Sequence, residues 1–90
     1  MNKIIFTGAY LKRASRFFRK HPELLEPYKK TIRLLEANHR HPSLRLHQIQ
    51  SQSLWSVSIN MQYRVTLEFV TQADGNIVLL NIGDHSIYQR

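Results

Sequence analysis

Residues 54–69, LWSVSINMQYRVTLEF, contain the pattern that decides the predicted fold. Apolar and polar residues alternate before and after the polar stretch 60–62, and a period of two is typical of strands with one buried face. The segment therefore predicts two neighbouring strands joined by a turn. Further along, residues 77–82 are apolar on both faces and follow Asp74-Gly75, which predicts a central strand after a tight reversal.

The chain before this segment is mostly helical in its period. Residues 9–20 carry apolar side chains at helical spacing, with basic residues on the rest of the cylinder, and a second helix is predicted to run to about Asn38. His21-Pro22 ends the first helix, because the residue before a proline is disfavoured in the α region. Residues 4–6 predict a first strand, after which Thr7 can cap the helix.

One more short strand is predicted between the helices and residue 54, because Leu44 and Leu46 alternate with Arg45 and His47. Together the elements predict an α+β fold, with two N-terminal helices packed on a largely antiparallel sheet of four to five strands. Ninety residues is the size of one domain, so we expect a single domain over residues 1–90.

The composition favours a polyanionic partner. Thirteen Lys and Arg against six Asp and Glu give a formal net charge of +7, which suits nucleic acid, an acidic protein or an anionic membrane. The first helix needs its apolar stripe to cover the sheet, so a membrane surface is the weakest of the three. With no cysteine, the chain has no disulfide, thiolate metal site or cysteine nucleophile. We expect a cytoplasmic protein, since no secretory signal or membrane span is recognisable.

The polar faces of the predicted strands give the candidate functional residues. If the apolar faces pack on the helices, the opposite faces form one solvent-exposed surface. That surface would hold Arg45, His47, Ser56, Ser58, Arg64, Thr66 and Glu68, and the tail can add His85, Tyr88 and Arg90. We expect no metal site and no cofactor, because His39, His41 and His47 lack the carboxylates or thiolates that usually accompany zinc.

These residue types suit cleavage of RNA without a metal. The reaction needs a base for the 2′-hydroxyl, an acid for the departing 5′-oxygen and fixed positive charge for the phosphorane between them. Histidine suits the acid or the base because it titrates near neutrality, and arginine suits the charge because it stays protonated and grips phosphate with two donors.

The sequence resembles the RelE/ParE toxin superfamily over nearly the whole chain. The order of elements is a strand, two helices and then a run of strands. The pieces that carry the resemblance are His21-Pro22-Glu23-Leu24, residues 44–49, residues 54–59, Tyr63-Arg64-Val65 and residues 82–88. No piece is specific alone, and their order and spacing together carry the likeness.

The resemblance implies a toxin of a type II toxin–antitoxin pair, which in the RelE-like branch enters the ribosomal A site and cleaves messenger RNA. Arg64 is similar to the strand arginine that holds the scissile phosphate in the family, and His85 to a histidine or arginine after the last strand. Tyr88 resembles the aromatic residue near the carboxyl terminus. We expect an acidic antitoxin that folds over the site as it binds. The expected assembly is a homodimer or a toxin–antitoxin hetero-oligomer.

The sequence departs from the family pattern at two places. Ser56 and Ser58 stand where some RelE-like enzymes carry lysines, and Arg45 stands where others carry a glutamate base. We therefore predict His47 as base or phosphate contact, with Glu68 as an outside candidate. The predicted substrate-binding residues are Arg45, Ser56, Ser58 and Arg90.

Other interpretations of the same residues stay open. A ParE-like toxin that binds DNA gyrase and cuts nothing would share the fold, and so would a catalytically degenerate member that still binds an antitoxin. Arg64 could simply pair with Glu68 on the sheet. His85 could be an ordinary surface histidine, and Tyr88 a packing residue.

Overall fold

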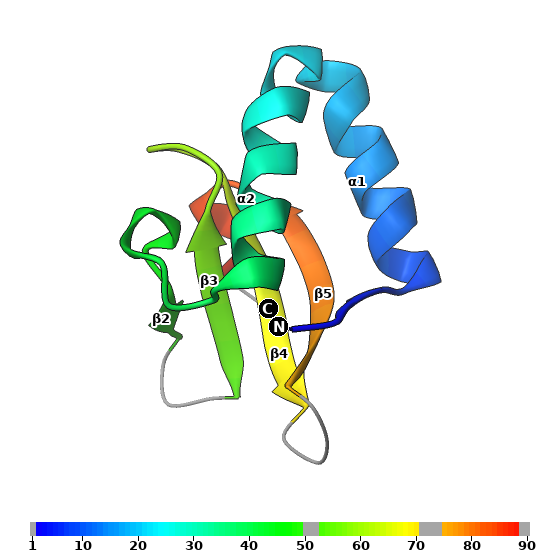
Figure 1. Cartoon of the computed structure of the whole chain (residues 1–90). Coiled ribbons are helices and arrows are strands. Elements are labelled where there is room, and N and C mark those ends of the chain that lie inside the picture. The colour runs from blue at the N-terminus through cyan, green and yellow to red at the C-terminus, as the bar shows by residue number, and fades with distance from the viewer. Residues whose placement is uncertain (1, 50–52, 71–74, 89–90) are drawn as a thin grey trace.

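The computed structural model describes residues 2–49, 53–70 and 75–88, and Figure 1 shows their arrangement. The strands are β1 (Ile4–Phe6), β2 (His47–Gln48), β3 (Leu54–Ser58), β4 (Arg64–Val70) and β5 (Asn76–Gly83). The α-helices are α1 (Gly8–Lys20) and α2 (Leu25–Ala37), and short 3-10 helices are η1 (Pro22–Leu24), η2 (Pro42–Leu44) and η3 (His85–Tyr88). No helix among the described residues has the length and apolarity to cross a membrane.

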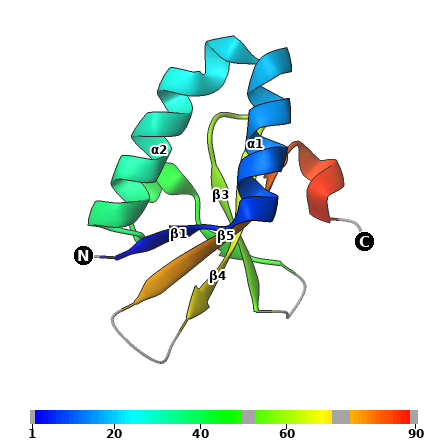
Figure 2. The same ribbon diagram turned by 90° about the vertical axis from the view of Figure 1, so that its right-hand side faces the viewer.

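The strands form one sheet in the order β1-β5-β4-β3-β2. β1 runs parallel to β5, and every other neighbouring pair is antiparallel. The predicted α+β class and largely antiparallel sheet are therefore confirmed. The first and last strands of the chain lie side by side, which brings α1 next to β5, as Figure 2 shows.

The helices start and stop where their local sequence predicts. The Thr7 hydroxyl accepts a hydrogen bond from the Tyr10 backbone nitrogen at 3.1 Å, which caps α1. The helix ends at Lys20 with His21 as its C-cap, directly before Pro22, and Pro27 lies in the first turn of α2. The apolar faces of helices and strands meet in one core around Leu35, Val57, Val65, Leu67, Ile77 and Leu79.

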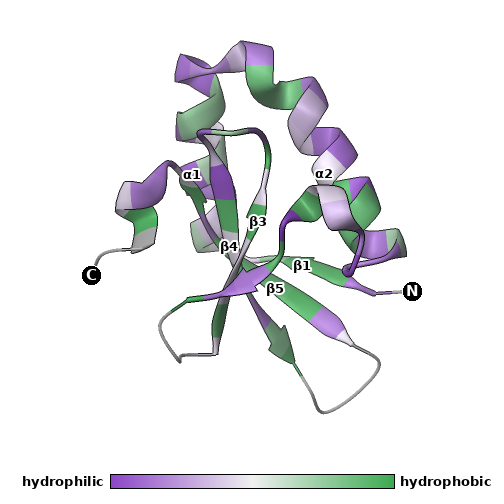
Figure 3. Ribbon diagram, turned by 90° about the vertical axis from the view of Figure 1, so that its left-hand side faces the viewer, coloured by the Kyte–Doolittle hydropathy of each residue, from purple (hydrophilic) through white to green (hydrophobic). Residues whose placement is uncertain are grey.

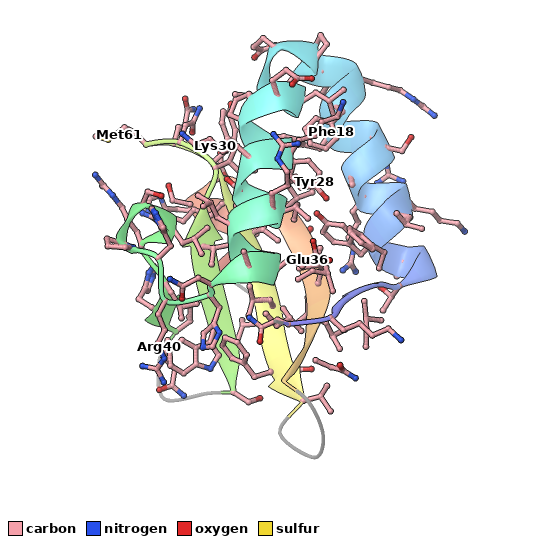
Figure 4. The ribbon with its side chains drawn as sticks, viewed as in Figure 1. Phe18, Tyr28, Lys30, Glu36, Arg40 and Met61 are labelled. Carbon is pink, nitrogen blue, oxygen red and sulfur yellow. The ribbon has the colours of Figure 1, made fainter. Side chains whose placement is uncertain are left out.

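Aromatic side chains join α1 to α2 inside this core. The rings of Phe18 and Tyr28 meet edge to face at 4.8 Å, and Figure 4 shows both between the two helices. The Tyr10 and Tyr28 hydroxyls are 2.8 Å apart and hydrogen-bonded. Burial, followed by the neighbouring Tyr28, raises the pKa of Tyr10 far above its usual range, so the pair stays neutral.

Tyr28→Phe is expected to lower the free energy of unfolding by about 1–2 kcal/mol, because it leaves the buried Tyr10 hydroxyl without its partner. The double variant Tyr10→Phe, Tyr28→Phe should regain part of that loss, since it removes both hydroxyls. Urea unfolding of the wild type and the variants measures both effects. A double variant with the summed loss of the two single variants would contradict a hydrogen-bonded pair.

The strand predicted around residues 44–47 is partly wrong. Leu44 ends η2, and Arg45 has a left-handed backbone with φ 49°, so the alternation does not begin until β2. Leu44 is buried in the core, so its burial follows from a turn of helix and not from a pleat. The predicted reversal at Asp74-Gly75 falls partly outside the described residues, since Asp74 is not among them.

Candidate active site

The register of the sheet brings polar residues from four strands to one face. Directly opposed residues point to the same side of a sheet. One row joins His47, Ser56, Thr66 and Asn81, and the next row joins Ser58, Arg64 and Gly83. This polar face, defined by the two rows, lies on the side away from the core. The alternation of residues 54–69 therefore predicted correctly which side chains share a face.

Part of the predicted exposure is wrong. Ser56 and Thr66 are fully buried, and Ser58 is only 8% exposed. β3 and β4 are inner strands, and short hydroxyl side chains there are easily covered by longer neighbours. The Ser58 hydroxyl donates to the Asn60 carbonyl, which ties it to the turn after β3. Ser56 and Ser58 are therefore too buried for the direct substrate contact that we expected.

Arg64 begins β4 and has an unusual environment. Its guanidinium nitrogens Nε and Nη1 are both buried, and within the described chain neither has a hydrogen-bond partner. The pairing with Glu68 that the sequence left open does not form, since no ion pair among the described residues includes Arg64. Glu68 instead accepts from the Ser53 hydroxyl at 3.3 Å. Native proteins rarely leave buried donors unpaired, so such a group requires an explanation, such as a bound ligand or an ordered water.

η3 folds back over the end of the polar face that Arg64 occupies. A side chain at Gly83 would meet Ile87 Cγ2 at 2.7 Å, and Gly83 stands directly opposite Arg64 in the register. Ile87 therefore lies on the same side of the sheet as Arg64. Figures 2 and 3 agree with this placement, because they show η3 across the sheet from α2.

A turn fixed by Asp84 sets the position of His85. The Asp84 carboxylate accepts from the Ser86 backbone nitrogen at 2.9 Å, and the hydrogen bonds from Ser86 hold the pKa of Asp84 below its usual range. His85 is exposed and begins η3. It lines an open hollow of about 570 Å³ together with Met61, Gln62, Asp84 and Ser86.

The lining residues of this hollow are neighbours of Arg64 in the sequence or neighbours of its cross-strand partner. Met61 and Gln62 precede Arg64 by three and two positions, and Asp84 and His85 follow Gly83, its cross-strand partner. The structure thus brings Arg64 and His85 to the same end of the polar face. Met61, which is 80% exposed and labelled in Figure 4, was missed as a wall of the hollow. The sequence did hold a signal for this role, because Met61 is an apolar residue inside the polar turn 60–62.

The remaining predicted residues lie elsewhere or beyond description. His47 is exposed on β2 at the far edge of the sheet, two strands from β4, which corresponds to roughly 10 Å across the ladder. Its Nδ1 lies 3.3 Å from the Arg45 carbonyl oxygen. Arg45 is exposed but precedes the strand, so it is not on the polar face as predicted. Tyr88 ends η3, and Arg90 lies outside the described residues.

Comparison with known proteins gives likeness in structure alone. No family model matches the chain, and no curated protein matches its sequence significantly. Among solved structures, YafQ from E. coli is 14% identical with a TM-score of 0.75, and the alignment covers 100% of both chains. In the E. coli DinJ-YafQ toxin–antitoxin complex, the match has 15% identity, a TM-score of 0.74 and coverage of 99% of this chain and 98% of the other.

The YoeB/ParE toxin from Agrobacterium tumefaciens gives a similar result, with 13% identity, a TM-score of 0.74 and coverage of 92% of this chain and 98% of that toxin. The likeness extends over the sheet, both helices and the segment that carries the candidate site. The chain therefore has the RelE/ParE-like toxin fold that its sequence predicted.

Proposed function

We propose that this chain is the toxin of a type II toxin–antitoxin system and cleaves messenger RNA on the ribosome without a metal. The observation that carries the proposal is the guanidinium of Arg64, with two buried nitrogens unpaired, at the same end of the polar face as exposed His85. A phosphate group would supply the acceptors that these nitrogens lack, and charge-assisted bonds of this kind are among the strongest in proteins.

The proposed reaction begins with attack of the 2′-oxygen on the adjacent phosphorus. A base takes the 2′-hydroxyl proton, the bond from phosphorus to the 5′-oxygen breaks, and His85 gives a proton to that oxygen. The products are a 2′,3′-cyclic phosphate and a 5′-hydroxyl end. Arg64 stabilises the charge that develops on the phosphoryl oxygens.

Four further residues have supporting roles in this proposal. His47 is the candidate base or a second phosphate contact, and its place at the sheet edge suits a substrate that spans several strands. Tyr88 would stack on a base or orient the strand, and Arg90 would add charge near it. Exposed Arg45 would meet a more distant phosphate.

The partner that we propose is an acidic antitoxin. The solved DinJ-YafQ structure is a toxin–antitoxin complex, and one of its chains has the same fold as this chain. A net charge of +7 on 90 residues favours a partner of opposite charge, which an acidic chain over the polar face would provide. Action at the ribosome would place the protein in the cytoplasm.

The test is induction of the wild type and of the Arg64→Ala, His85→Ala double variant in a bacterial host, followed by mapping of messenger RNA 5′ ends. We expect new ends inside translated codons with the wild type and none with the double variant. Growth arrest without new ends would instead favour a gyrase-binding toxin of the ParE kind. No arrest at all would indicate a degenerate member.

A further inference from the structure

A second basic site lies between α1 and β5. α1 carries Arg13, Arg16 and Lys20 at positions i, i+3 and i+7, a spacing that places them along one stripe of the helix. With Phe17 and His21, they line an open hollow of about 250 Å³ whose other wall is Asn81 and Ile82 of β5. We call this the α1 hollow. His21 lies 3.7 Å from the Glu23 carboxylate, but no ion pair among the described residues includes Arg13, Arg16 or Lys20, so these three cations are available to an anion.

An irregularity in the sheet fixes one side of the α1 hollow. Thr66 pairs with Asn81 and Leu67 with Leu79, so the register skips Leu80 and forms a bulge. Arg13 Nη1 donates to the Leu80 carbonyl oxygen at 2.7 Å. This bond holds the arginine against the sheet in a defined place, while Arg16 and Lys20 are exposed and can move onto a ligand.

The α1 hollow shares Asn81 with the polar face of the candidate active site. Asn81 stands in the row of Thr66, and Gly83 stands in the row of Arg64. Two residues along a strand span roughly 7 Å, so the wall of the α1 hollow begins close to the row that holds Arg64. An extended polyanion on the polar face would reach the α1 hollow without leaving the surface.

From this geometry we propose that the α1 hollow binds a phosphate group of the RNA backbone, as a second contact beside the phosphate at Arg64. The identity of the ligand rests on the proposed function, whereas the anion site rests on the lining residues. Three cations suit a phosphate, and the hollow shares Asn81 with the polar face, which favours an RNA strand with a phosphate at every nucleotide over an acidic protein segment. The site would set the direction of the strand without reading its sequence.

The experiment measures binding of a fluorescent single-stranded 2′-O-methyl RNA by anisotropy at several salt concentrations. Methylation removes the attacking hydroxyl, so binding is read without cleavage. The Arg16→Gln, Lys20→Gln variant alters the α1 hollow and leaves the Arg13 bond intact. The control is Lys30→Gln, Arg33→Gln on exposed positions of α2, which lowers the net charge of +7 by the same two units.

We expect the α1-hollow variant to bind about tenfold more weakly near 0.1 M salt, with a salt dependence shallower by about 0.7 for each phosphate that the protein no longer neutralises. The control should keep the slope of the wild type. An equal loss of RNA affinity in both variants would overturn the inference, because the lower net charge alone would then explain the loss. Unchanged RNA affinity with weaker binding of polyglutamate would overturn it too, and would assign the hollow to an acidic protein.

Failure of this inference is separable from failure of the proposed function. If the α1-hollow variant loses RNA affinity while the wild type makes no new messenger RNA ends, the second phosphate site stands and the nuclease proposal falls. If the wild type makes new ends while the two variants bind RNA alike, the nuclease proposal stands and the α1 hollow is no RNA site.

Discussion

Arg64→Met is expected to reduce messenger RNA cleavage by roughly 100-fold or more while leaving the protein as stable as the wild type, or up to about 2 kcal/mol more stable. The two effects have one cause. Nε and Nη1 of Arg64 are buried without partners, so folding removes them from water and the described chain returns no hydrogen bonds. Methionine fills similar space without that cost, but it cannot hold a phosphate.

The comparison needs both urea unfolding and a cleavage assay on the same samples. Arg33→Met, the same chemical change at an exposed site on α2, is the control and should shift stability by no more than about 0.5 kcal/mol. A loss of about 3–5 kcal/mol in Arg64→Met would show that the guanidinium has a structural partner, because breaking a buried ion pair is that costly. The functional assignment of Arg64 would then fail.

His85→Gln is expected to slow cleavage by roughly 100-fold to 10,000-fold, the usual contribution of a general acid. The role can be tested by substituting sulfur for the 5′-oxygen at the scissile bond. A thiol has a pKa of about 8.5, far below that of an alcohol, so a thiolate departs without a donated proton. On the sulfur-containing message, the variant should therefore approach the rate of the wild type.

His85 is exposed, so its replacement should leave the fold intact. His41→Gln, a histidine outside the candidate site, serves as control and should cleave both messages normally. An equal defect of His85→Gln on oxygen and sulfur messages would exclude a general acid and leave a binding role. No defect on either message would remove His85 from the proposed machinery.

Residues of the candidate site differ in how far the sequence predicted them. The alternation of β3 and β4 assigned Arg64, Ser56 and Ser58 to one face, and the register confirms that assignment. Their exposure could not be predicted, because it depends on which neighbours cover each position. Alternation reports the side to which a residue points, whereas burial is a property of the assembled sheet.

The site at the end of β5 shows a second limit. The tail was expected to add His85 to the polar surface, but no local pattern predicted that residues 85–88 would form η3 with Ile87 against Gly83. The bulge at Leu80 could not be predicted from the sequence either. The hydrogen bond from Arg13 to the Leu80 carbonyl joins residues that are 67 positions apart. Arg45 was wrongly placed on the polar face. Its left-handed backbone interrupts the strand, but the apolar and polar residue types still alternate in the sequence there.

The sequence by itself determined the helices, the strands β1, β3, β4 and β5, and the side of the sheet to which the polar residues of β3 and β4 point, because spacing and prolines act over a few residues. Tertiary structure alone decided the order of the strands that no turn joins, which hydroxyls are covered and which cations gather at β5. Those outcomes follow from contacts between distant segments, and local periodicity carries no information about such contacts. The resemblance assigned Arg64 and His85 to one site, and the pairing of Arg64 with Gly83 across two strands brings their segments to the same end of the sheet.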